Sequence, residues 1–168
     1  MRRSRLGDTG ISIREFSFSD LDRVMQINFE CLPENYSSYF YNDLYQRFPK
    51  VFQVAEVDGG IQGYIMCRIE RGFSKLKALR PARLCHVVSI AVREPFRRRG
   101  IGAELLLTAM RNGREEYEAD ECYLEVRVSN GPAIRLYEKL GFVKVKRSFS
   151  YYMDGEDAWV FATSLEKE

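Results

Sequence analysis

The stretch from Cys85 to Tyr117 constrains the fold more than any other part of the chain. An apolar run at Cys85–Val92 is followed by a basic turn, by Gly100 and Gly102, and by apolar residues at helical spacing. The first N–H groups of a helix have no acceptor within the helix, and glycines there let an anion approach the backbone. The stretch therefore predicts a buried strand, a phosphate-binding turn and a helix.

A pair of glycines alone is weak support for such a site, because Gly-x-Gly also marks ordinary turns. No Lys-Ser or Lys-Thr follows the glycines and there is no third glycine, which excludes a P-loop and a dinucleotide-binding fingerprint. The remaining pattern, Arg97-x-x-Gly100-x-Gly102, resembles the coenzyme A signature of the GNAT family of acetyltransferases. This resemblance implies acetyl-CoA as a co-substrate.

The segment from Asn130 to Phe142 carries a second resemblance. Asn130-x-x-Ala133-x-x-Leu136-Tyr137-x-x-Leu140-Gly141-Phe142 resembles the C-terminal cofactor motif of the same family, which implies that Tyr137 lies near the sulfur of coenzyme A and donates to it. The two motifs together imply a set of cofactor-binding residues: Ile90, Ala91, Val92, Arg97, Arg98, Arg99, Gly100, Ile101, Gly102, Ala103, Asn130 and Tyr137.

The order of the predicted elements indicates one GNAT domain over residues 11–168. The order is β-α-α-β-β-β-α-β-α-β-β, without an internal repeat or a linker. The resemblance implies an α/β fold with a mixed seven-stranded sheet and helices on both of its faces. It also implies that the fourth and fifth strands splay apart, so that coenzyme A enters between Cys85–Val92 and Glu121–Val128. Residues 1–10 are polar and basic, and they are predicted to form a disordered leader.

Local patterns place the remaining elements. Alternation predicts an edge strand at Ile11–Phe16, and Ser19 is expected to open a helix that stops before Pro33. The turn Asp58-Gly59-Gly60 predicts a hairpin. The other expected elements are strands at 51–57 and 61–70, a polar connection of undefined structure at 71–83, helices at 101–117 and from Pro132 to Leu140, and a last hairpin with strands at 142–151 and 157–163.

Composition limits the classes of protein to which the chain can belong. Its 168 residues suit one core, and a net charge of +2 is too close to neutral to indicate a nucleic-acid-binding protein. The four cysteines lie far apart, which favours free thiols over a zinc site or a disulfide framework. Because there is neither a long apolar run nor a signal sequence, we expect no membrane association and a cytoplasmic location.

Basic residues gather in the connection at 71–83: Arg71, Lys75, Lys77, Arg80 and Arg83. They are candidates for contact with the ribosome or with an auxiliary subunit. The arginines at 97–99 lie directly before the glycines and are assigned to the phosphates of the cofactor instead. We expect no sequence-specific binding of nucleic acid.

Four segments carry a narrower resemblance: Leu32–Tyr36, His86–Val92, Arg97–Gly102 and Tyr123–Asn130. They resemble the NatA-type catalytic subunits and their archaeal, RimI-like relatives, which acetylate protein N-termini. The resemblance implies that the first segment faces the first residues of a bound peptide. Tyr39 and Tyr41 also suit a peptide groove that is partly exposed to water, because their rings are apolar and their hydroxyl groups are polar. The expected substrate-binding residues are Leu32, Glu34, Tyr36, Tyr151 and Tyr152.

Acetyl transfer to an amine needs a proton acceptor and donors for the developing charge. His86 is the only histidine, and a lone strand histidine is usually a core residue with satisfied hydrogen bonds. Glu125, however, lies in an otherwise apolar strand across the expected cleft, where an unpaired charge is costly. His86 and Glu125 are therefore candidates for a base that acts through water, and Glu34 is a third candidate. Two ligands do not define a metal site, so no metal is predicted.

The sequence leaves three functions open. The first is transfer of acetyl from acetyl-CoA to the α-amino group of protein N-termini, by direct attack in a ternary complex. The second is acetylation of a lysine or of a small amine on the same fold. The third is a non-catalytic module that binds acetyl-CoA or RNA, which the intact cofactor motifs at Asn130 and Tyr137 disfavour.

Overall fold

Strands β4 (Gly60–Phe73) and β5 (Pro81–Val92) run through both of the compact units into which the chain folds. The computed structural model describes residues 4–5 and 10–166. The first unit comprises the described residues up to Arg68 together with Val88–Asn112. The second comprises Ile69–Val87 together with the described residues from Gly113 onward.

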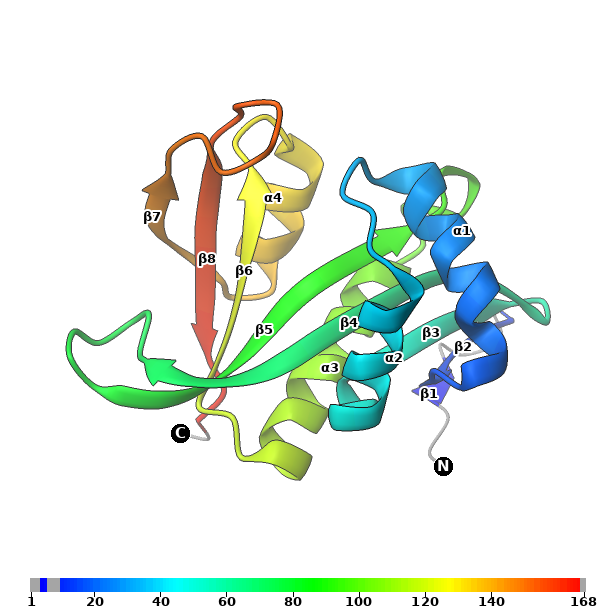
Figure 1. Ribbon diagram of the computed structural model, residues 1–168, viewed down its shortest axis with the longest axis horizontal. Helices are drawn as coiled ribbons and strands as arrows, with labels where there is room; N and C mark the ends of the chain where they lie inside the picture. Colours follow the sequence, from blue (N-terminus) through cyan, green and yellow to red (C-terminus); the bar gives the residue numbers. More distant parts are fainter. Residues whose placement is uncertain (1–3, 6–9, 167–168) are drawn as a thin grey trace. The chain divides into compact units, whose positions relative to one another are not determined.

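The first unit is a sheet with helices on both faces. Its strands lie in the order β1-β2-β3-β4-β5, and the pairs from β1 to β4 are antiparallel. Helices α1 and α2 lie on one face and the first turns of α3 lie on the other (Figure 1). The bounds are β1 Ser4–Arg5, β2 Ile11–Glu15, η1 Phe18–Asp20, α1 Leu21–Cys31, α2 Ser38–Arg47, η2 Pro49–Val51, β3 Phe52–Val57, η3 Glu94–Phe96 and α3 Ile101–Tyr117.

The second unit continues the strand order as β5-β6-β8-β7, with β6 (Glu121–Arg127), β7 (Val143–Ser148), β8 (Ala158–Ser164) and α4 (Gly131–Lys139). β5 and β6 are parallel, and they pair only at three positions, from Leu84 opposite Glu121 to His86 opposite Tyr123. This is short for strands of 12 and 7 residues. The two strands therefore pair over only part of their lengths. This agrees with the splay expected between the fourth and fifth strands, which are β5 and β6 when β1 is not counted.

The N-terminal region differs from the prediction in two respects. β2 is not an edge strand, because Ser4 in β1 pairs with Ile13 on its outer side. The helical region begins at η1, where the carboxylate of Asp20 accepts from the Ser17 N–H at 2.8 Å; Ser19 does not open it. The predicted leader falls largely on residues 1–3 and 6–9, which lie outside the described residues.

The connection expected at 71–83 is strand at both of its ends, because β4 extends to Phe73 and β5 begins at Pro81, which leaves 74–80 as a turn. The turn is held by Glu121 from β6, whose carboxylate accepts from the Lys75 N–H at 2.8 Å and from the Ser74 hydroxyl. Glu121 is distant in sequence from this turn. The composition of residues 71–83 alone therefore could not indicate that strands extend into the segment.

Other predicted elements agree with the structure. Helix α3 has the predicted bounds, the hairpin at Asp58-Gly59-Gly60 joins β3 to β4, and Gly141 with a φ of 93° follows α4. The last hairpin is present with shorter strands, because the residues between β7 and β8 form a loop in which Asp157 accepts from the Ser150 N–H at 2.8 Å. Of the helices in the described part of the chain, none has the length and apolar character to cross a membrane.

Two tyrosines are fully buried in the core of the first unit, and their hydroxyls differ. The Tyr64 oxygen lies 2.7 Å from Ser89 Oγ and accepts from Asn28 Nδ2 at 2.9 Å. The Tyr41 hydroxyl has no hydrogen-bond partner among the described residues. Burial raises the pKa of both phenols. The expectation that Tyr41 lines a peptide groove is wrong, because its side chain is enclosed between α2 and the sheet.

We expect Tyr41→Phe and Tyr64→Phe to change stability in opposite directions. Tyr41→Phe removes a buried hydroxyl without a partner and should raise the free energy of unfolding by up to about 1 kcal/mol. Tyr64→Phe removes the partner of Ser89 and Asn28 and should lower it by about 1–3 kcal/mol. Urea unfolding of both variants and the parent measures the difference. Equal destabilisation by the two changes would contradict the assignment of an unsatisfied hydroxyl to Tyr41.

Candidate active site

The turn before α3 leaves backbone N–H groups without an acceptor inside the helix. Arg98 and Gly100 have positive φ values of 64° and 78°, and a side chain at Gly100 would meet nothing within 4 Å. Glu104 donates its N–H to the Gly100 carbonyl at 3.0 Å, so the N–H groups that precede it in the helix have no helical acceptor. Such an open turn at a helix N-terminus suits a phosphate group.

The three arginines assigned to the cofactor differ in their contacts. Arg97 donates from Nε to the Val92 carbonyl at 2.7 Å and so ties the turn to the end of β5. The Arg99 guanidinium lies over the Phe96 ring, 5.6 Å from its centroid. Arg98 is exposed. Arg97 therefore shapes the turn, while Arg98 and Arg99 present positive charge on its surface.

The segment Ile90–Val92 forms the last residues of β5 and is fixed to β4. Arg93, the next residue, donates its N–H to the Gln62 carbonyl at 2.9 Å and a guanidinium N–H to the Gln62 side chain at 2.9 Å. A Cβ at Gly63 would lie 3.0 Å from the Ala91 carbonyl oxygen, so glycine permits the close approach of the two strands. The end of β5 is thus a rigid edge beside the turn.

The loop that carries Glu34 is anchored by a buried amide. Asn28, on α1, is 1% exposed and donates from Nδ2 to the Glu34 carbonyl at 3.1 Å as well as to Tyr64. Leu32 donates its N–H to the Asn28 carbonyl at 2.9 Å and packs half-buried against the core. The anchoring contact of Asn28 with the Glu34 loop was not predicted from the sequence; the signal was an amide at a position that the helical pattern places in the core.

The aromatic residues after Glu34 divide between core and surface. Tyr36 is half-buried, stacks on Phe40 with a centroid distance of 4.9 Å, and donates its hydroxyl to the Val88 carbonyl at 3.4 Å. Tyr39 is 79% exposed. Of the aromatics expected to face a peptide, Tyr36 is therefore the one fixed against β5.

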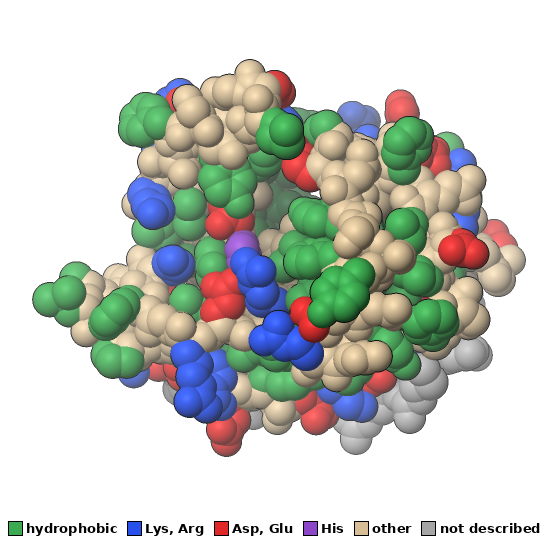
Figure 2. Space-filling model, in the orientation of Figure 1, with side chains coloured by type: hydrophobic (Ala, Val, Ile, Leu, Met, Phe, Trp, Pro, Cys, Tyr) green, Lys and Arg blue, Asp and Glu red, His purple; other side chains and the backbone are tan. Residues whose placement is uncertain are grey.

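In the second unit, His86 lies between carboxylates from two strands. Its Nε2 is 2.7 Å from Glu125 Oε2, and its Nδ1 is 2.9 Å from Glu70 Oε2. Figure 2 shows the single histidine, in purple, with acidic side chains above and below it. The structure thus brings together the predicted pair, His86 and Glu125, and adds Glu70.

Glu70 and Tyr123 were missed in the sequence. Tyr123 lies opposite His86 in the β5–β6 register, stacks on its ring at 4.2 Å with an interplanar angle of 8°, and donates its hydroxyl to Glu70 Oε1. The Lys75 ammonium lies 4.6 Å from the centroid of the Tyr123 ring. The available signal was the carboxylate of Glu70 in a strand that is largely apolar from Tyr64 to Ile69.

The surroundings of His86 favour its protonated form. Burial lowers the pKa of the ring, but hydrogen bonds and charges from Glu125 and Glu70 outweigh it, so the pKa lies above its usual value. The ring therefore contributes stability that is present below the unfolded-state pKa of about 6.5 and is lost as pH rises through the higher folded-state pKa.

Tyr137 and Asn130 belong to α4. The Asn130 side chain accepts from the Ala133 N–H at 3.3 Å and caps the helix, which orients the face that carries Tyr137. The Tyr137 ring is buried against Phe142 and Phe161, and burial raises the pKa of its hydroxyl to about 12. Tyr137 therefore stays protonated at neutral pH.

Tyr151 and Tyr152 lie in the loop between β7 and β8. Their rings meet edge to face at 5.0 Å, and the Arg127 guanidinium lies 4.0 Å from the Tyr152 centroid. Arg127 also pairs with Asp154 at 2.8 Å. Tyr152 is thus fixed to the end of β6, whereas Tyr151 is 47% exposed.

The predicted site residues are divided between the units. The first unit holds Leu32, Glu34, Tyr36 and the cofactor residues from Ile90 to Ala103, and the second holds His86, Glu125, Asn130, Tyr137, Tyr151 and Tyr152. The four cysteines are free thiols. Across residues 4–5 and 10–166, no group of three or more His, Cys, Asp and Glu side chains is arranged to hold a metal.

Residues 21–142 match the acetyltransferase (GNAT) family. The chain belongs to the GNAT family. It is 53% identical to an N-alpha-acetyltransferase of Sulfurisphaera tokodaii over 154 residues, which cover 91% of this chain and 92% of the relative. The crystal structure of Ard1 from Thermoplasma volcanium is similar with a TM-score of 0.80 and 31% identity, over 94% of this chain and 99% of Ard1.

A further similar structure is that of NAA60 from Arabidopsis thaliana in complex with acetyl-CoA. It has a TM-score of 0.78 and 25% identity, over 92% of this chain and 99% of NAA60. The fold expected from the two cofactor motifs, a single GNAT domain with a mixed sheet, is confirmed.

Proposed function

We propose that this GNAT protein transfers the acetyl group of acetyl-CoA to the α-amino group of protein N-termini. The observation that carries the proposal is the identity of 53% to an N-alpha-acetyltransferase over nearly the whole of both chains. The complex of acetyl-CoA with the similar NAA60 supports acetyl-CoA as the acetyl donor. The open turn before α3 and the ionisable cluster at His86 supply chemistry that such a transfer needs.

The reaction forms one bond and breaks one. In a ternary complex the neutral α-amine attacks the thioester carbonyl, the new C–N bond forms, and the C–S bond breaks as coenzyme A leaves. The substrate amine must lose a proton, for which Glu34, His86 and Glu125 are the candidate acceptors. We assign the acetyl oxygen to backbone N–H groups at Ile90–Val92.

The cofactor phosphates are assigned to the turn before α3. The helix N–H groups of Ile101, Gly102 and Ala103 and the guanidinium groups of Arg98 and Arg99 suit an anion there. Arg97 and Gly100 give the turn its shape through their contact with Val92 and their backbone conformation. Asn130 contributes by capping α4.

Tyr137 acts as a hydrogen-bond donor to the departing thiolate. Its pKa of about 12 lies above that of a thiol, about 8.5, so full proton transfer from the phenol to the sulfur is uphill by roughly 5 kcal/mol. A hydrogen bond stabilises the developing charge without that transfer.

The peptide is assigned to two aromatic surfaces. In the first unit, Leu32 and Tyr36 border Glu34, and the anchoring of this loop by Asn28 fixes their backbone. In the second unit, Tyr151 and Tyr152 lie in the loop after β7. Hydroxyls at both surfaces can orient the first peptide bonds.

Peptide α-amines should be acetylated much faster than lysine side chains. An α-amine has a pKa near 8 and a lysine near 10.4, so the neutral lysine costs about 3.3 kcal/mol more at the same pH. The test compares a peptide with a free Ser or Ala N-terminus with a blocked peptide that carries an accessible lysine. Mass spectrometry of fragments locates the acetyl group, and faster modification of the blocked peptide would favour a lysine acetyltransferase.

Gly102→Glu should raise the acetyl-CoA dissociation constant, because it places a carboxylate where the phosphates are assigned. Gly102→Ala is the matched control, since it adds a side chain to the same helix position without a charge. Calorimetric titration of acetyl-CoA into both folded variants measures the effect. Unchanged affinity in Gly102→Glu would contradict the assignment of the turn.

We also propose that the tip of the β4–β5 hairpin contacts ribosomal RNA. Residues 71–83 hold basic but no acidic side chains, and Phe73 and Leu79 at the tip are 63% and 88% exposed. Arg80 pairs with Glu166 at 3.0 Å. Arg71 and Lys77 have no charged partner among the described residues, and they leave positive charge for phosphate contacts.

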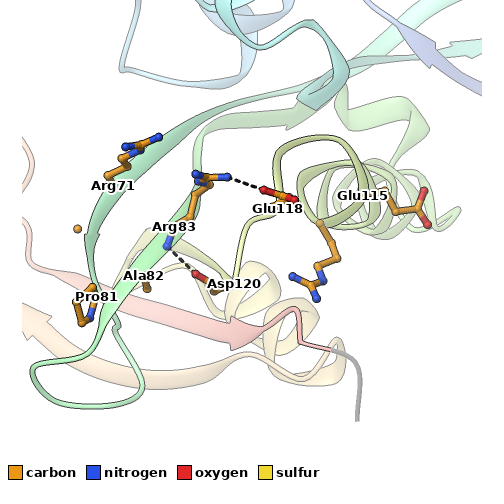
Figure 3. Close-up of a pocket in the computed structure, with 9 residues that line it drawn as sticks. Arg71, Pro81, Ala82, Arg83, Glu115, Glu118 and Asp120 are labelled. Carbon is orange, nitrogen blue, oxygen red and sulfur yellow. Dashed lines mark hydrogen bonds and ion pairs between the residues drawn. The ribbon is translucent and has the colours of Figure 1, made fainter.

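Arg83 is engaged at the base of the hairpin, beside a pocket of about 840 Å³. The Arg83 guanidinium is 3.2 Å from Glu118, and the backbone N–H of Arg83 donates to Asp120 at 2.8 Å. Dashed lines mark both contacts in Figure 3. Of the arginines on this pocket, Arg83 is paired, whereas Arg71 has no charged partner among the described residues. We therefore assign the RNA contact to Arg71 and to the tip of the hairpin.

The double change Arg71→Glu and Lys77→Glu should reduce co-sedimentation with ribosomes severalfold at low salt, since each phosphate contact adds to binding. The matched control reverses two exposed charges elsewhere, Arg111→Glu and Lys139→Glu. Acetylation of a short peptide in the absence of ribosomes should be equal in both. Equal loss of ribosome binding in both double variants would indicate a general charge effect and reject the hairpin contact.

A further inference from the structure

Two cysteines that lie far apart in the sequence are directly opposite each other in the sheet of the second unit. Cys85 on β5 is the partner of Cys122 on β6, at the middle of the three positions where these parallel strands pair. The residues that follow them, His86 and Tyr123, stack on each other on one face of the sheet. Because successive side chains of a strand point to opposite faces, both thiols point to the other face.

Both thiols are enclosed on that face. Cys85 and Cys122 are each 0% exposed. A Cβ at Gly113, on α3, would lie 3.2 Å from Cys85 Sγ, so the helix packs closely over this sulfur. Burial and, to a smaller extent, the thiol of Cys122 raise the pKa of Tyr137, so Cys122 faces α4. The two thiols therefore lie between the sheet and the helices, away from water.

The thiols also contact each other. The hydrogen bond with Cys85 and burial raise the pKa of the Cys122 thiol well above its usual range. The thiolate is the form that attacks a disulfide, so a thiol in this state reacts slowly while the sheet is closed. Reaction of the pair therefore requires local opening of β5 and β6, which pair over only three positions.

The positions of the two cysteines suit a disulfide between them. Neighbouring strands of a sheet lie about 4.7–4.9 Å apart, and the Cα atoms of directly opposite residues have about this separation. Disulfides join cysteines whose Cα atoms are about 4.4–6.8 Å apart. Both side chains also leave the sheet on the same face, so a bond between the sulfurs needs no change of strand register.

We propose that Cys85 and Cys122 form a reversible disulfide, which links β5 to β6 beside the position where their pairing ends. The reaction is exchange with a small-molecule disulfide. One cysteine attacks a sulfur of that molecule and forms a mixed disulfide, and the other cysteine then attacks the mixed disulfide. One S–S bond breaks in the small molecule and one forms in the protein. The two protons of the protein thiols pass to the two small thiols that leave.

The disulfide should stabilise the second unit. The chain between the two cysteines contains the end of β5, the turn before α3 and α3 itself. A covalent link that closes this long segment reduces the conformational freedom of the unfolded chain. The link also holds β5 and β6 together where few backbone pairings do so. This proposal is independent of the proposed acetyl transfer.

Mass spectrometry detects the disulfide directly. The reduced protein is equilibrated with excess glutathione disulfide, both in the folded state and during refolding from urea, so that burial does not limit the reaction. Acid stops the exchange, and the remaining thiols are alkylated in denaturant. The parent has four cysteines, and we expect it to lose two alkylatable thiols and to give a fragment that joins Cys85 to Cys122.

The double variant Cys31→Ala and Cys67→Ala is the matched control, because it keeps only the proposed pair of cysteines. It should form the same disulfide, whereas Cys122→Ala should form no internal disulfide. The proposal would be overturned by a folded parent that keeps all of its thiols, that carries bound glutathione only, or that links Cys85 or Cys122 to another cysteine.

Thermal unfolding measures the effect of the link. The oxidised parent should unfold about 5–15 °C above the reduced parent, the usual range for one disulfide in a domain of this size, and a dithiol reductant should reverse the shift. Cys85→Ala and Cys122→Ala should each unfold at the same temperature with and without the oxidant. An oxidised parent that unfolds at or below the midpoint of the reduced parent would contradict the proposal. Neither measurement requires acetyl transfer, so both remain valid if the proposed function fails.

Discussion

An ionised carboxylate inside a sheet is stable only when positive charge or hydrogen-bond donors lie against it. In the second unit of this GNAT protein, the imidazole of His86 supplies both. The ring contacts Glu70 on β4 and Glu125 on β6, so it links the strands on either side of β5. Without the ring, two carboxylates would face each other in a half-buried space, and at least one would be driven to its neutral form. The electrostatic environment of Glu125 therefore depends on His86.

In the first unit, buried polar groups without charge also need hydrogen-bond partners. Asn28, Tyr64 and Ser89 come from α1, β4 and β5 and satisfy one another inside the core. The amide of Asn28 also reaches the Glu34 carbonyl, so the loop assigned to the peptide is held by the same hydrogen bonds that fill the core. Loop position and core packing are consequently coupled. The Tyr41 hydroxyl is buried beside this network without a hydrogen-bond partner in the part of the chain that the structure describes, so the core tolerates an unsatisfied polar group.

The extent to which the sequence predicted the fold depends on whether the deciding contacts are local. Helix α3 was predicted with its observed bounds, because its apolar spacing and the glycines at its start are local signals. The turn at 74–80 was not predicted, because its structure relies on Glu121, a residue from β6. The role of Ser17 at the first helical turn was also missed, since Ser19 satisfies the same local rule and only the position of Asp20 decides between them.

For the site, the sequence by itself determined the glycine-containing turn before α3, the capped helix of Tyr137 and the presence of a lone histidine and a carboxylate in neighbouring strands. These features depend on short stretches of consecutive residues, and such stretches determine the local backbone conformation directly. The tertiary structure alone decided that Glu70 and Tyr123 join His86, because strand register sets which side chains meet and register is fixed by pairing over the whole sheet. It likewise raised the pKa of the ring. The protonation of a group depends on the charges and hydrogen-bonding groups around it, and these neighbours, Glu70 and Glu125, lie 16 and 39 residues away along the chain.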